Sequence, residues 1–136
     1  LAGGQSLLPS MRLRLANPEK IVDLNGVAEL AGIRRDGNAL VIGAMTRHAD
    51  VAANVELLAA LPVLAHLAAH IGDRQVRTMG TLGGSVANND PAACYPSAVL
   101  GLGATVITNK REIAADDTDA RPGKRVGIAD GILEQQ

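Results

Sequence analysis

The sequence has almost no aromatic residues. Its 136 residues include no Trp, no Phe and a single Tyr, Tyr95. Proteins that bind single-stranded nucleic acids stack the bases on aromatic side chains, and such a platform is missing here. The charge is also balanced, because 13 Lys and Arg residues oppose 14 Asp and Glu residues. Since no basic field attracts a polyanion, we expect no nucleic acid as a partner.

Cysteine is nearly absent as well. The single residue, Cys94, cannot form an internal disulfide, hold an iron–sulfur cluster or build a cysteine-rich zinc site. No Lys, Arg or His lies near it in the sequence, so we interpret it as a small packing residue rather than a reactive thiolate. This use of cysteine indicates a reducing compartment, and we expect a cytoplasmic protein.

Long apolar runs are missing too. Pro62, His66 and His70 interrupt the most apolar stretch, residues 57–71, so no segment reaches the roughly 20 apolar residues of a spanning helix and we expect no membrane insertion. The chain starts without Met, and we expect that its natural N-terminus is missing. Residues 118–136 are rich in charge, Gly and Pro, which predicts a poorly ordered or unrelated tail. Residues 1–117 then form one modest domain with an aliphatic core.

Turn residues and apolar spacing predict a mixture of helices and strands. Asp36-Gly37-Asn38 supplies the positive φ of a tight turn, which predicts an antiparallel hairpin. Thr46 predicts the N-cap of a helix that ends before Pro62, and Pro62 starts the next helix. These signals place strands at 21–24, 30–35, 39–43 and 104–108, helices at 51–61, 62–71 and 91–100, and an irregular loop at 77–89. The order of the elements predicts an α+β fold.

Two segments join adjacent glycines to small polar residues: Ala2-Gly3-Gly4-Gln5-Ser6 and Thr81-Leu82-Gly83-Gly84-Ser85. Such a backbone can turn several N–H groups toward one point and admit a ligand closely, which suits a phosphate. Either segment alone is also typical of a plain turn, but two together favour a shared phosphate site. We therefore expect the two segments to lie side by side in the fold.

Other phosphate motifs do not fit the sequence. Gly123-Lys124 lacks both the upstream glycine and the following Ser or Thr of a P-loop. Gly101-Leu102-Gly103 lacks the third glycine of the dinucleotide fingerprint, and we interpret it as the end of a helix.

Two further motifs have both a structural and a functional interpretation. His66 and His70 have the spacing of two metal ligands on one helix face, but no Glu follows His66 as the zinc-protease pattern requires. We assign no metal site and interpret the pair as a partly exposed helix face that meets solvent or a partner subunit. Asp90, directly before Pro91, is most simply an N-cap, with a ligand contact as the alternative.

Four segments taken together resemble a known protein family. They are Ala2-Gly3-Gly4-Gln5-Ser6-Leu7-Leu8-Pro9, Ile21-Val22-Asp23-Leu24, Ile42-Gly43-Ala44-Met45-Thr46, and Thr81-Leu82-Gly83-Gly84-Ser85 with the Asn89-Asp90-Pro91 that follows. In this order they resemble the flavin-binding medium subunit of the molybdenum hydroxylases, as in carbon monoxide dehydrogenase and xanthine dehydrogenase. The resemblance covers residues 1–117. It implies a partial FAD-binding fold of the vanillyl-alcohol-oxidase (PCMH) type, truncated at both ends.

The resemblance also implies which residues bind the cofactor, FAD. The first glycine segment forms one phosphate loop and the second forms another, with main-chain N–H groups as the principal donors. Cys94 falls where many relatives carry an acidic residue that touches FAD, and Asp90 is included as a contact. No catalytic residue and no metal ligand is expected. The implied cofactor-binding residues are Ala2, Gly3, Gly4, Gln5, Ser6, Thr81, Leu82, Gly83, Gly84, Ser85, Asp90 and Cys94.

By the same resemblance, the chain is an oxidoreductase subunit that transfers electrons. In the family, electrons pass from a molybdopterin large subunit through a [2Fe-2S] small subunit to FAD and then to an external acceptor. One alternative is a non-catalytic remnant or interaction module that does not hold FAD alone. A third hypothesis is a stand-alone binder of nucleotide phosphates.

Overall fold

Two antiparallel hairpins supply all the strands in residues 1–115, the part of the chain that the computed structural model describes. In the first, β1 (Ile33–Asp36) pairs with β2 (Ala39–Ile42), and Asp36 lies opposite Ala39. The connecting turn is therefore Gly37-Asn38, with Gly37 at a φ of +58°, as a type II′ turn requires at its first central position. The predicted hairpin is confirmed.

The second hairpin pairs β3 (Thr105–Ile107) with β4 (Glu112–Ala114). The strand predicted at 104–108 is thus confirmed, whereas β4 was missed. Its turn is closed by the side chain of Thr108, whose Oγ1 accepts hydrogen bonds from the backbone N–H groups of Lys110 and Arg111. The sequence signal for this hairpin was weak, because its turn contains no glycine or proline.

The helices of the described residues are short, and polar side chains begin several of them. Asn54 accepts a hydrogen bond from Leu57 N, Asp73 from Val76 N, and Thr81 from Gly84 N. The elements are α1 (Leu7–Arg12), the 3₁₀ turn η1 (Ala28–Leu30), α2 (His48–Ala53), α3 (Val55–Ala60), α4 (Pro62–Ala69), α5 (Arg74–Met79), α6 (Leu82–Asn88) and α7 (Cys94–Gly101). The predicted α+β class is confirmed.

Three sequence predictions about helices need correction. The loop predicted at 77–89 is wrong, because the caps at Asp73 and Thr81 begin α5 and α6 there. The helix predicted at 51–61 is interrupted at Asn54, which ends α2 and caps α3. Thr46 is not an N-cap, because its Oγ1 accepts from Gly32 N and donates to Gly32 O, both at 3.0 Å. By contrast, α4 begins at Pro62 as predicted, and α7 ends at Gly101 as predicted.

The strand predicted at 21–24 is also wrong. Among the described residues, this segment forms long-range backbone hydrogen bonds with Leu1 alone: the terminal ammonium of Leu1 donates to Val22 O, and Leu24 N donates to Leu1 O at 3.0 Å. A single residue cannot build a ladder of strand hydrogen bonds. The contact nevertheless anchors the first glycine segment (residues 2–6) to the body of the molecule.

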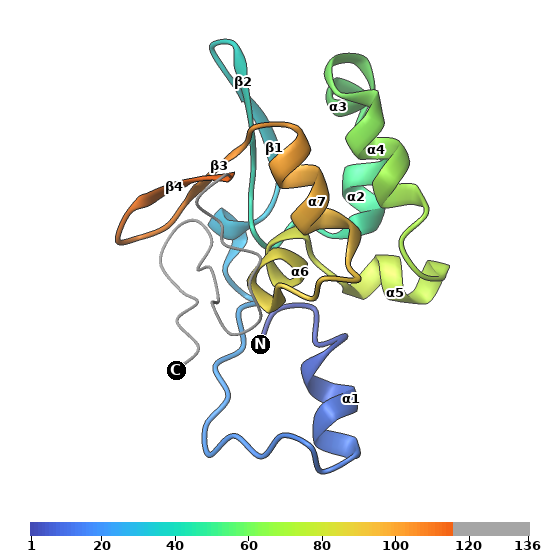
Figure 1. Cartoon of the computed structure of the whole chain (residues 1–136), viewed down its shortest axis with the longest axis vertical. Coiled ribbons are helices and arrows are strands. Elements are labelled where there is room, and N and C mark those ends of the chain that lie inside the picture. Colours follow the sequence, from blue (N-terminus) through green and yellow to red (C-terminus); the bar gives the residue numbers. More distant parts are fainter. Residues whose placement is uncertain (116–136) are drawn as a thin grey trace.

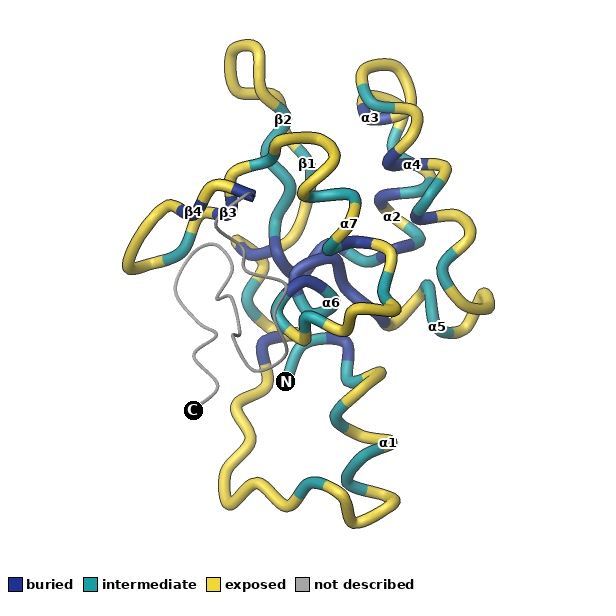
Figure 2. The backbone as a smooth tube through the Cα atoms, viewed as in Figure 1, coloured by how far each residue is buried: buried dark blue, intermediate teal, exposed yellow. Residues whose placement is uncertain are grey.

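The hydrophobic core lies between the helices and the two hairpins. Its centre is formed by Tyr95, Leu57 and Val51, which are fully buried. Figure 1 shows the α2–α4 group on one side and the two hairpins on the other. Helix α1 projects below this body, and Figure 2 shows it in a mixture of exposed and intermediate colours, with no buried residue. Within residues 1–115, no helix is both long and apolar enough to cross a membrane.

Candidate functional site

The two glycine segments line one cavity of about 390 Å³. The first glycine segment forms one wall, and the second glycine segment (residues 81–85) forms the opposite wall from the start of α6. They approach so closely that a Cβ atom on Gly84 would lie 3.3 Å from the Cβ of Ala2. The prediction that two segments far apart in the sequence lie side by side is confirmed. The cavity volume is within the roughly 300–1,000 Å³ of small-molecule sites.

The first glycine segment presents free hydrogen-bond donors. Gly4 has a φ of +75°, in the left-handed region that turns successive N–H groups toward the same side. Within the described part of the chain, the backbone N–H groups of Gly4, Gln5, Ser6 and Leu7 donate no hydrogen bond. All four residues line the cavity. Four consecutive unpaired donors on a cavity wall make an anion-binding backbone, because each would otherwise need water or a ligand as its partner.

The second glycine segment has a different role from the one predicted. The N–H of Leu82 donates to Thr46 O at 2.9 Å, and that of Gly83 donates to Ala44 O at 2.8 Å. Neither residue lines the cavity. The N–H of Gly84 is also engaged, since it donates to Thr81 Oγ1 at 3.1 Å. The N–H groups at the start of α6 therefore hold the fold together, and the expectation that they are principal ligand donors is not met.

Gly83 is required by packing. A Cβ atom at this position would lie 2.5 Å from the Cβ of Ala44 and 2.6 Å from its carbonyl oxygen. The glycine lets α6 approach the segment that follows β2 closely enough for the hydrogen bond from Gly83 N to form. Its place in the motif is explained by this contact between two backbones.

What the second glycine segment offers the cavity is side-chain hydroxyls. Thr81 lines the cavity and is 3% exposed. Its Oγ1 accepts the hydrogen bond from Gly84 N, which leaves the hydroxyl proton available for an acceptor in the cavity. Ser85, one turn of α6 after Thr81, lines the same wall.

His48, which the sequence analysis did not consider, lies at the base of the cavity. Its side chain is buried, and its Nε2 occupies the place that a Cβ on Gly80 would need, 2.5 Å away. Its Nδ1 has no hydrogen-bond partner among the described residues. Burial lowers the pKa of His48 to about 4, so the ring is neutral at neutral pH. The available signal was its position two residues after the resembling segment 42–46.

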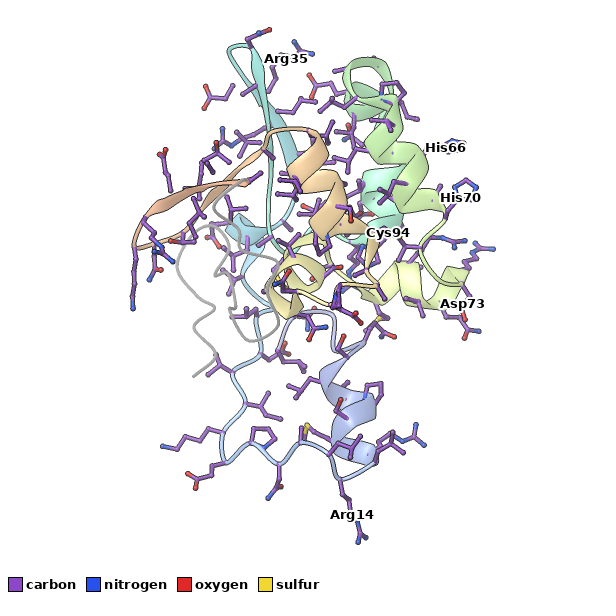
Figure 3. The ribbon with its side chains drawn as sticks, in the orientation of Figure 1. Arg14, Arg35, His66, His70, Asp73 and Cys94 are labelled. Atoms are coloured by element: carbon purple, nitrogen blue, oxygen red, sulfur yellow. The ribbon has the colours of Figure 1, made fainter. Side chains whose placement is uncertain are left out.

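Asp90 lines the cavity, but Cys94 does not. The carboxylate of Asp90 accepts a hydrogen bond from Ala92 N at 2.9 Å, within a turn, and Ala93 is the N-cap of α7. The N-cap prediction for Asp90 is therefore wrong, because the N-cap lies three residues later. Cys94 begins α7 and is exposed (Figure 3), so its interpretation as a packing residue is also wrong.

The described lining of the cavity has no cationic side chain. Among the described residues that line it there is no Lys or Arg, and Asp90 has the charged side chain in its wall. An anionic ligand would therefore be neutralised by backbone dipoles, as in the nests that hold phosphates. Of the residues predicted to bind the cofactor, the cavity unites Ala2, Gly3, Gly4, Gln5, Ser6, Thr81, Gly84, Ser85 and Asp90, and it excludes Leu82, Gly83 and Cys94.

Comparison with known proteins gives consistent results. Residues 1–131 match the family described as the FAD binding domain in molybdopterin dehydrogenase. The glyceraldehyde dehydrogenase medium chain of Sulfolobus acidocaldarius is 43% identical over 107 residues, which are 79% of this chain and 38% of the relative. The carbon monoxide dehydrogenase medium chain of Hydrogenophaga pseudoflava is 42% identical over 120 residues, 85% of this chain and 42% of the relative.

Solved structures show the same similarity. Carbon monoxide dehydrogenase from Hydrogenophaga pseudoflava, in a form that lacks the Mo-pyranopterin moiety, superposes with a TM-score of 0.82 at 43% identity. Quinoline 2-oxidoreductase from Pseudomonas putida 86 gives a TM-score of 0.80 at 38% identity. Both matches cover 85% of this chain and 42% of the matched chain. The chain thus spans less than half the length of these relatives.

Proposed function

The chain belongs to the family of FAD binding domains in molybdopterin dehydrogenases, and we propose that its cavity binds the diphosphate of FAD. One observation carries this proposal: the four unpaired backbone N–H groups of residues 4–7 on the wall of the cavity. A diphosphate offers several anionic oxygens close together, which suits several donors on a short piece of backbone.

The residues of the cavity have distinct parts in this proposal. The N–H groups of Gly4 to Leu7 donate to the diphosphate oxygens, and the hydroxyl of Thr81 donates from the opposite wall. The absence of a Cβ at Gly84 leaves room next to Ala2, where the two walls come together. Asp90, at the edge, is placed to accept from a hydroxyl of the ligand rather than to meet its phosphates. When bound, FAD supplies the redox chemistry that no side chain of this protein provides.

We propose further that the chain acts as an electron-transfer subunit of a molybdenum hydroxylase. Its relatives are medium chains or subunits of dehydrogenases, which supports a place in a multi-subunit complex. A single cysteine cannot ligate an iron–sulfur cluster, so the clusters that deliver electrons belong to a [2Fe-2S] small subunit, and the molybdopterin to a large subunit. The external acceptor would then take electrons from the flavin.

A second candidate function is a remnant or interaction module that does not retain FAD alone. It is favoured by the lack of a Phe, Tyr or Trp side chain among the described residues that line the cavity. The single aromatic residue, Tyr95, is fully buried in the core and cannot stack on a flavin. Without such a contact, most of the apolar area of the isoalloxazine stays in water, and the diphosphate supplies most of the affinity.

Titration of the full chain with FAD, ADP and riboflavin tests the proposal. If the diphosphate is the anchor, FAD and ADP bind with similar affinity, and riboflavin, which has no phosphate, does not bind. Equal binding of FAD and riboflavin would contradict the diphosphate assignment. Absence of binding by all three at millimolar concentration would favour the remnant.

A matched pair of variants locates the site. Gly4→Ala and Gly37→Ala both place a Cβ on a residue with positive φ, at +75° and +58°, so both carry a similar backbone strain. Gly37 lies in the hairpin turn with open space around it, away from the cavity. A Cβ on Gly4 would also lie 2.8 Å from Leu8 Cδ1, but Leu8 is 42% exposed and its side chain can move aside. We expect both variants to lose similar stability and only Gly4→Ala to lose FAD affinity.

A further inference from the structure

His66 and His70 lie against each other on the exposed side of α4. The ring centroids are 4.6 Å apart, with an angle of 38° between the planes. His66 is in the last turn of the helix and His70 is its C-cap residue. Both are exposed, and Figure 3 shows both rings projecting from the same side of the helix. The pair is remote from the candidate FAD cavity, which neither residue lines.

A backbone hydrogen bond fixes the tautomer of one ring. The Nδ1 of His70 lies 2.7 Å from the carbonyl oxygen of His66. A carbonyl oxygen can only accept, so Nδ1 carries the proton and donates it. In the neutral ring, the lone pair is then on Nε2, the nitrogen that points away from the helix. Histidines that bind metals commonly have this arrangement, in which the second nitrogen donates to a backbone carbonyl.

The separation of the rings agrees with chelation of one metal ion. A metal held at about 2.1 Å by one nitrogen of each ring lies about 3.2 Å from each centroid, so ligands at about 90° put the centroids about 4.5 Å apart. The observed 4.6 Å is close to this value. Residues four apart on a helix are neighbours, so the backbone already provides the spacing that a chelate needs.

We propose that His66 and His70 form a two-histidine site for a borderline divalent transition metal ion such as Ni²⁺, Cu²⁺ or Zn²⁺. Imidazole nitrogen suits these ions, whereas Mg²⁺ requires oxygen ligands. The described residues contain no group of three or more His, Cys, Asp or Glu side chains placed to hold a metal, so water or an external ligand completes the coordination. Asp73 does not serve, because its carboxylate caps α5 by accepting from Val76 N at 2.8 Å.

Calorimetric titration of the full chain with Ni²⁺ alone tests the site. We expect one Ni²⁺ per chain, and binding weaker by about tenfold or more in His66→Ala and in His70→Ala, because each variant keeps one ligand and loses the chelate. Both side chains are exposed, so circular dichroism should show that both variants fold. Cu²⁺ should bind more tightly than Ni²⁺, and Mg²⁺ should not bind.

A relocated histidine provides the matched control. Val63 is 61% exposed on the same helix, so Val63→His combined with His66→Ala keeps two exposed histidines but separates them by seven residues. That separation is about 10 Å along the helix axis, too far for one metal ion. We expect this double variant to bind Ni²⁺ as weakly as His66→Ala. Tight binding by the double variant or by either single variant would overturn the proposal, as would one Ni²⁺ per two chains with the mass of a dimer.

Discussion

His48 and Tyr95 lie with their ring centroids 5.2 Å apart and their planes tilted by 42°. Each ring carries a buried polar atom, His48 Nδ1 and Tyr95 OH, that has no hydrogen-bond partner among the described residues. The pair links α2 to α7, and His48 also forms part of the cavity wall. The contact between the rings is therefore both a packing element of the core and the support for one side of the candidate site.

Tyr95→Phe should leave the free energy of unfolding unchanged or raise it by about 1 kcal/mol. The substitution removes a buried hydroxyl without a partner, whose desolvation opposes folding, and it keeps the ring. Urea denaturation of both proteins measures the difference. Tyr95→Ala is the comparison, with an expected loss of about 3–5 kcal/mol from the cavity it creates. A loss of more than about 1 kcal/mol in Tyr95→Phe would show that the hydroxyl has a partner.

The stability of the protein should fall as the pH falls from 6.5 toward 4. Burial lowers the pKa of His48 from its ordinary 6.5 to about 4, so in this window the unfolded chain binds a proton that the folded chain does not. Above pH 6.5 the ring is neutral in both states, and the free energy of unfolding keeps its full value. Near pH 4 the free energy of unfolding is lower by as much as about 3 kcal/mol. Denaturation across this range should show the dependence.

His48→Phe is the control for this pH effect. It keeps an aromatic ring against Tyr95 and removes the titrating group. The difference in stability between wild type and variant should shift in favour of the variant as the pH is lowered. A difference that does not change with pH would mean that the fold does not shift the pKa of His48.

Gly83→Ala should destabilise the fold, whereas Gly101→Ala should not. A Cβ on Gly83 meets Ala44 at 2.5 Å, and overpacking of this kind costs about 1–3 kcal/mol or more. Gly101 is also helical but has nothing within 4 Å, and alanine there favours the helix by up to about 1 kcal/mol. Thermal denaturation of the two variants shows whether Gly83 is needed for close packing against Ala44. Equal stability of both would contradict the packing role of Gly83.

Thr46→Val should cost about 1–3 kcal/mol, because it removes two hydrogen bonds and leaves the N–H of Gly32 without a partner, whereas the carbonyl of Gly32 keeps the hydrogen bond from Gly43 N. Thr46 is 2% exposed, so its side chain lies inside the fold. Thr78→Val is the matched change on the surface, where Thr78 Oγ1 donates to Gln75 O in an exposed position. We expect that variant to stay within about 0.5 kcal/mol of wild type. Comparable effects at both positions, measured by urea denaturation, would contradict the role of the Thr46 bridge.

The sequence by itself determined the features that depend on a few neighbouring residues. The turn at Gly37 and the helix start at Pro62 follow from the φ preferences of single residues. The two glycine segments were recognised in the same way, as places where the backbone can approach a ligand. The helices α5 and α6 were missed, although Asp73 and Thr81 are ordinary caps, because Gly80, Gly83 and Gly84 and the polar residues around them are typical of a loop.

Only the tertiary structure decided what each glycine does. The N–H groups of residues 4–7 stay free because nothing in the described fold packs against them, whereas those of Leu82 and Gly83 are taken by Thr46 and Ala44. The two glycine segments thus differ in function, because the first lines a cavity and the second packs against the backbone of Ala44 and Thr46. His48 joins the site by the same cause, since Gly80 leaves room for its ring. A hydrogen bond between residues far apart in the sequence depends on how the chain packs, and a local sequence pattern does not determine that packing.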